Sequence, residues 1–133
     1  MNRYSKFPIY FFLVLVVLSN IATVKSSVAV HRSSVVLIGE GVELKCSVTG
    51  NDVATWKYTA WNSSTETNIY LGKDDIVTSM RSRYKIDKNI SGQYNLIIEP
   101  VDLVHAGRYQ CLGVQQSLIN DIQLIVLGKN KYT

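Results

Sequence analysis

The sequence has few cysteines and histidines, and it lacks a long apolar run and a recognisable catalytic motif. It has only two cysteines and two widely separated histidines, a poor ligand set for zinc. The apolar run at residues 9–18 has ten residues, about half of the ~20 that a membrane-spanning helix needs. No glycine-rich phosphate loop and no serine in a nucleophile elbow is recognisable. We therefore expect no metal, no cofactor and no enzymatic activity.

The apolar run has the flanks of a secretory signal peptide. Arg3 and Lys6 precede it, and polar and small residues follow it. We expect cleavage after Ser26, with Ala22 as a rival end point and an uncleaved anchor as the other interpretation.

We expect three regions along the chain. Residues 1–26 are the expected leader, residues 27–128 a single domain, and residues 129–133 a polar tail. No apolar run or lipid-anchor signal follows the domain, so the mature chain is expected to be secreted, or extracellular, without a membrane span.

The charge of the chain does not indicate a nucleic-acid partner. The full sequence carries 14 basic and 10 acidic residues, a net charge of +4. The leader contains three of the basic residues and no acidic one, so the mature chain has a net charge of only +1. The one local basic cluster, at residues 81–88, includes Asp87 and is typical of a solvated strand face.

Short runs of alternating apolar residues, separated by clusters of glycine, asparagine, aspartate and serine, predict an all-β sandwich or barrel. In one of them Val42, Leu44, Cys46 and Val48 would face inward. The expected strands are residues 27–38, 42–48, 53–59, 68–72, 76–80, 83–87, 93–100, 107–113 and 118–127.

Four residues form a more specific pattern. Trp56 lies between Cys46 and Cys111, and Tyr109 stands two residues before the second cysteine. Two cysteines behind a signal peptide favour one disulfide in an oxidising compartment, worth about 4 kcal/mol for this loop, over two free thiols or a metal pair.

This pattern resembles the immunoglobulin superfamily over nearly all of the chain after the leader. The resemblance implies an immunoglobulin-like β-sandwich of two antiparallel sheets, pinned by an inter-sheet disulfide between Cys46 and Cys111. It also implies that Trp56 packs against this bond and that the Tyr109 hydroxyl ties a corner back to the backbone. The length between Trp56 and Arg83 leaves room for the extra strands of a variable-type (V-type) domain.

Two departures from the family pattern are visible. His105 stands where members with this corner commonly carry an acid that pairs with an arginine at the position of Arg83. We expect His105 to be a tolerated surface residue, with Asp102 replacing the acid or Arg83 facing solvent; a pH-sensing histidine is the alternative. The aromatic-Gly-x-Gly bulge of antigen receptors is missing at residues 117–121, which argues against a rearranged receptor chain.

The resemblance implies recognition by protein–protein contact, in cell adhesion or in cell-surface and immune recognition, with a homophilic or heterophilic partner. Strand parity predicts an outward sheet face with Leu112 as its exposed apolar centre, although a solvated face with one stray leucine fits equally well. The candidate binding residues are Thr55, Lys57, Arg108, Gln110, Leu112, Val114, Gln115 and Gln116.

Two alternative functions remain. A soluble humoral binder of glycans or microbial surfaces would use Tyr58, Trp61 and Tyr70 for stacking. A non-catalytic subunit, or a fragment, of a larger adhesion receptor would present residues 122–127 as an exposed edge strand.

Two sequons predict a glycoprotein. Asn62-Ser63-Ser64 and Asn89-Ile90-Ser91 both fall in expected loops, and we expect at least one of Asn62 and Asn89 to carry a glycan.

Overall fold

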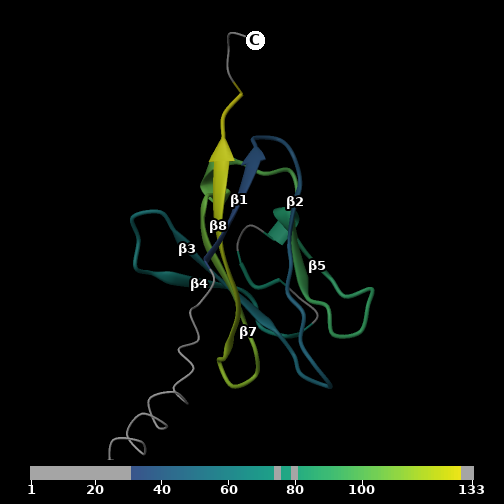
Figure 1. Ribbon diagram of the computed structural model, residues 1–133. Coiled ribbons are helices and arrows are strands. Elements are labelled where there is room, and N and C mark those ends of the chain that lie inside the picture. The colour runs from purple at the N-terminus through teal and green to yellow at the C-terminus, as the bar shows by residue number, and fades with distance from the viewer. Residues whose placement is uncertain (1–30, 74–75, 79–80, 130–133) are drawn as a thin grey trace, which may run out of the picture.

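The computed structural model describes residues 31–73, 76–78 and 81–129. These residues form two sheets that pack face to face (Figure 1). The five-stranded sheet has the order β1 (His31–Leu37), β8 (Leu118–Leu127), β7 (Gly107–Leu112), β3 (Thr55–Ala60) and β4 (Glu66–Tyr70). The three-stranded sheet has the order β2 (Val42–Leu44), β6 (Asn95–Ile98) and β5 (Tyr84–Asp87), and two 3-10 turns are η1 (Arg81–Arg83) and η2 (Leu103–His105).

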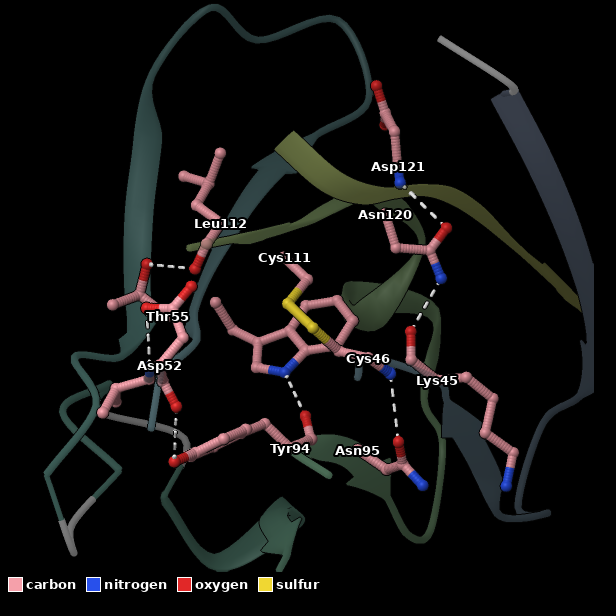
Figure 2. Close-up of a disulfide and its surroundings, with 12 residues drawn as sticks. Lys45, Cys46, Asp52, Thr55, Tyr94, Asn95, Cys111, Leu112, Asn120 and Asp121 are labelled. Atoms are coloured by element: carbon pink, nitrogen blue, oxygen red, sulfur yellow. Dashed lines mark hydrogen bonds between the residues drawn. A yellow bond between two sulfur atoms is a disulfide. The ribbon is translucent and has the colours of Figure 1, made fainter. Parts of the chain in front are cut away.

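The core lies between the sheets around the disulfide, as Figure 2 shows. Cys46, just after β2, is bonded to Cys111 of β7, so the bond joins the two sheets. Trp56 is fully buried, and its indole N–H donates to the carbonyl of Tyr94 at 2.7 Å. The expected all-β sandwich and its inter-sheet disulfide are therefore confirmed.

β2 is shorter than the run of alternating residues predicted. The strand ends at Leu44, and one isolated bridge joins Ser47 to Gln93 further on. Between them, the backbone N–H of Cys46 donates to the side-chain Oδ1 of Asn95 at 3.0 Å, as Figure 2 shows. A buried amide side chain thus replaces a backbone acceptor at this point, which interrupts the ladder.

The position of β8 in the large sheet differs from the expectation. β1 runs parallel to β8, whereas the other strand pairs of the described residues are antiparallel. β8 therefore lies between β1 and β7, and the predicted exposed edge at residues 122–127 is wrong because β1 covers it.

The extra strands predicted between Trp56 and Arg83 form only in part. β4 pairs with β3, as expected for one of them. The other, expected at residues 76–80, contributes a single bridge between Ile76 and Tyr70, and residues 79–80 lie outside the described residues.

The fold does not test the expected leader and polar tail. The leader, residues 1–26, lies outside the described residues, as do residues 27–30 of the expected first strand and residues 130–133 of the tail. Within the described part of the chain, we find no helix with the length and apolarity to cross a membrane.

Candidate interaction face

The outward side of the five-stranded sheet carries most of the predicted binding residues. Trp56 of β3 and Tyr109 and Cys111 of β7 are fully buried. Their immediate neighbours along each strand have the opposite parity and therefore face outward. The register places Lys57 opposite Gln110 and Gln110 opposite Asp121. We call this surface the front face; on β3, β7 and β8 it comprises Thr55, Lys57, Thr59, Arg108, Gln110, Asp121 and Gln123.

Two ion pairs neutralise the charges of the front face. Arg108 binds the Asp121 carboxylate with two nitrogens, and its Nε donates to Oδ1 at 2.9 Å. Lys57 Nζ lies 3.3 Å from Glu66 Oε2 of the neighbouring strand β4. The hydrogen bond to Asp121 raises the pKa of the Arg108 guanidinium above its ordinary value. These cations are therefore held by the chain's own acids rather than presented to an anionic partner.

Leu112 is not the exposed centre of this face, and that prediction is wrong. The side chain is only 8% exposed. The pairing of β7 with β8 shifts register between Cys111 and Leu112, which brings Leu112 opposite Leu118. The extra residue of this shift, Ile119, belongs to β8, and β7 keeps Leu112 opposite Thr55 of β3, so Leu112 keeps the outward parity of Arg108 and Gln110 but is covered.

The turn after β7 is exposed, as predicted. Val114 is 63% exposed, and Gln115 and Gln116 are exposed beside it. The backbone N–H of Gly113 donates to the carbonyl of Ser117 at 2.9 Å, which closes the turn.

An apolar strip borders the front face along β1 and β8, and the sequence analysis missed it. The parallel register places Val35 beside Ile125 and Leu37 beside Leu127. Val36 is buried in the core, so its neighbours Val35 and Leu37 face outward. Val35 is 60% exposed, Leu37 41% and Leu127 47%. We call these four residues the apolar border.

The three aromatic residues proposed for glycan stacking do not share one surface. Tyr70 is buried. Tyr58 is partly buried, and its hydroxyl donates to the carbonyl of Ala106 at 2.8 Å. Trp61 is exposed. The glycan hypothesis thus retains one exposed aromatic ring of the three.

The corner before β7 confirms the role expected of Tyr109. Its hydroxyl donates to the backbone carbonyl of His105 at 2.7 Å. The expectation of a surface His105 is wrong, because the side chain is fully buried. Asp102 does not replace the missing acid: its carboxylate caps η2 by accepting the N–H of Leu103, and Arg83 donates to the carbonyl of Pro100.

Both sequons lie in exposed turns. Asn62 follows β3 in a left-handed conformation, with φ of 58°, and Asn89 follows β5. Both asparagines are exposed, so each side chain is accessible to a glycosyltransferase.

Shallow hollows lie on the described surface away from the front face. Three shallow hollows lined by described residues have volumes of about 160, 200 and 240 Å³. These volumes are below the ~300–1,000 Å³ of typical small-molecule sites. Within residues 31–73, 76–78 and 81–129 there is also no group of three or more metal-ligating side chains.

Comparison with known proteins places this geometry among related domains. A model of the immunoglobulin domain family matches residues 25–113. No curated protein sequence matches the chain.

Three solved structures share the fold at low sequence identity. The ZIG-8 IG1 homodimer has a TM-score of 0.63 and 18% identity, covering 74% of this chain and 81% of that one. The second structure contains the extracellular domain of the voltage-gated sodium channel beta4 subunit. It has a TM-score of 0.56 and 17% identity, covering 84% of this chain and 97% of that one. That domain is described as a parallel homodimer that explains the role of the beta4 subunit in cell–cell adhesion. The ZIG-8–RIG-5 IG1–IG1 heterodimer has a TM-score of 0.61 and 18% identity over 73% and 82% of the two chains.

Proposed function

This chain belongs to the immunoglobulin domain family, and on that premise we propose that it is an extracellular recognition module that binds another protein through its front face. The observation that carries the proposal is the combination of internally neutralised charges with the exposed apolar border. An interface commonly joins such an apolar area to a polar surround whose hydrogen-bonding groups are satisfied.

The related structures support a particular kind of partner. The ZIG-8 and beta4 domains form homodimers, and ZIG-8 also pairs with RIG-5. We therefore propose a second immunoglobulin domain as the partner, either another copy of this chain or a different one. Catalysis is not part of the proposal.

Secretion and glycosylation belong to the same proposal. The expected leader at residues 1–26 would direct the chain out of the cell, where the Cys46–Cys111 disulfide is stable. Glycans on Asn62 and Asn89 would project from turns outside the strands of the front face and leave its centre accessible.

Expression of the full chain in a glycosylating, secreting cell tests these statements together. We expect the protein in the medium, with a mass that falls by one glycan in each of Asn62→Gln and Asn89→Gln. A mass that neither substitution changes would refute the glycosylation, and retention of the folded chain inside the cell would refute the secretion.

Sedimentation of the secreted protein over a range of concentrations tests the partner. A concentration-dependent dimer would identify a second copy as the partner. If the protein remains a monomer, binding is measured against a panel of immunoglobulin-domain ectodomains. Binding to none of them, with no self-association, would overturn the proposed function.

A further inference from the structure

The corner that carries η2 contains a buried histidine with an unusual set of neighbours. His105 is fully buried, and its Nδ1 accepts the backbone N–H of Asp102 at 2.8 Å. A ring nitrogen that accepts a hydrogen bond carries no proton, so the neutral imidazole holds its proton on Nε2. Nε2 is buried without a hydrogen-bond partner among the described residues.

A second proton on this ring would break the corner's own hydrogen bond. Protonated Nδ1 would point its N–H at the N–H of Asp102, so that two donors would meet where a donor now meets an acceptor. The Asp102 backbone N–H would lose its partner, and the cap of η2 would open on that side.

The groups around the ring offer little compensation for a buried positive charge. Burial lowers the pKa of His105 below its ordinary value, and the Arg83 guanidinium from η1 lowers it further, whereas a backbone hydrogen bond to Asp102 and the Asp102 carboxylate raise it without reversing the effect of burial. The Tyr84 ring of β5 packs edge-on at a centroid distance of 5.5 Å. The hydroxyls of Tyr84 and Tyr109 lie 3.3 Å apart, and burial raises the pKa of both, so they remain neutral in weak acid.

This corner is also coupled to the large sheet. Tyr109 of β7 donates its hydroxyl to the His105 carbonyl at 2.7 Å. Tyr58 of β3 donates to the carbonyls of Val104 and Ala106 at 2.9 and 2.8 Å. If η2 opens, β3 and β7 lose these hydrogen bonds to the corner. Because β7 carries Arg108 and Gln110, the change would reach the front face.

We propose that His105 is an acid-sensitive lock: the neutral ring closes the corner between β6 and β7, and its protonation in weak acid releases that corner and destabilises the domain. The proposal does not depend on the identity of any partner. It assigns a titrating role to the position at which the sequence pattern expects a permanently charged acid.

The direction of the pH dependence follows from the lowered pKa. In the unfolded chain His105 titrates near its ordinary value of about 6.5, whereas the folded chain resists the proton. The neutral His105 therefore makes its full contribution to folding stability above about pH 6.5, and that contribution is lost as the pH falls. Each pH unit below that value lowers the folding equilibrium constant by up to about tenfold, until the folded His105 also titrates.

Urea denaturation of the full secreted chain between about pH 8 and about pH 5.5 measures this effect. Carboxylates with ordinary pKa values near 4 stay ionised over most of that range, which isolates the histidines. His31→Gln is the matched control, because His31 is the other histidine of the sequence. His105→Asp replaces the lock by an acid that is already charged and lies near Arg83.

We expect the wild type and His31→Gln to lose up to about fivefold in the folding equilibrium constant between about pH 6.5 and pH 5.5. His105→Asp should show a nearly flat profile. Equal pH slopes in His105→Asp and the wild type would overturn the proposal.

Nuclear magnetic resonance of the wild-type imidazole keeps the test decisive if His105→Asp fails to fold. We expect the folded His105 ring to show the tautomer protonated on Nε2 and to take up its second proton only below the ordinary histidine pKa. A His105 that titrates at or above about pH 6.5 in the folded domain would refute the lock.

Discussion

Replacing Arg108 by alanine should destabilise the whole domain, because this front-face arginine serves a buried acid. Asp121 is only 2% exposed, and Arg108 donates to both of its carboxylate oxygens. Hydrogen bonds to a charged group contribute roughly 1.5–3 kcal/mol, and a buried carboxylate that loses such a partner is costly. Arg108 itself is 44% exposed, so water screens the pair, and we expect a loss of about 2 kcal/mol.

The assay is thermal and urea unfolding of Arg108→Ala beside two controls. For a domain of about 100 residues, about 2 kcal/mol corresponds to a fall in Tm of roughly 8 °C or more. Arg108→Lys should fall between the wild type and Arg108→Ala, since an ammonium group cannot form the two parallel bonds. Lys57→Ala, which removes a more exposed pair with Glu66, should cost about 1 kcal/mol or less.

A double-mutant cycle with Asp121→Asn separates the pair from other effects. We expect a coupling energy of about 1 kcal/mol or more between Arg108 and Asp121. The reasoning is refuted if Arg108→Ala costs under about 0.5 kcal/mol and its effect adds to that of Asp121→Asn.

Three further substitutions test the interior of the domain. Tyr109→Phe removes the hydroxyl bonded to the His105 carbonyl and should cost about 1–2 kcal/mol in urea unfolding; no measurable loss would show that the corner does not need this bond. Asn95→Leu leaves the Cys46 N–H without its side-chain acceptor and should cost about 1–3 kcal/mol, so unchanged stability would contradict the interruption described for β2. Replacing Cys46 and Cys111 together by alanine should cost about 4 kcal/mol, measured against the oxidised wild type, and a loss below about 1 kcal/mol would show that the chain-entropy argument fails here.

The alternating pattern of the sequence predicts the inner faces of β3 and β7 well. Trp56, Tyr109 and Cys111 are all buried, as parity requires. Parity alone does not predict the burial of Leu112, which stands opposite Thr55 on the outward side and beside a register shift that adds Ile119 to β8. A bulge depends on how two strands pair, and neither strand's own sequence reveals it.

The sequence pattern did not predict the contacts between residues that lie far apart in the chain. The Arg108–Asp121 pair requires the register of β7 against β8, and the apolar border requires the parallel pairing of β1 with β8. No local pattern selects that neighbour for residues 31–37.

The sequence around His105 contains a local signal for the orientation of its ring. Asp102 and His105 have the three-residue spacing of a capping box, with histidine in the place of the usual glutamate or glutamine. That spacing indicates that the ring turns back toward the backbone of Asp102, although its burial against Tyr84 depends on the tertiary fold.

The most direct test of the front face compares two valines of nearly equal exposure. Val35 of the apolar border is 60% exposed and Val104 of η2 is 59% exposed. The affinity of the secreted chain for its partner, or for itself, is measured for Val35→Asp and Val104→Asp after both are shown to fold as the wild type does. We predict that Val35→Asp weakens binding by about tenfold or more, since a charge placed in an apolar interface is costly, while Val104→Asp binds as the wild type does. Wild-type affinity in Val35→Asp, or an equal loss in both variants, would contradict the front face as the binding surface.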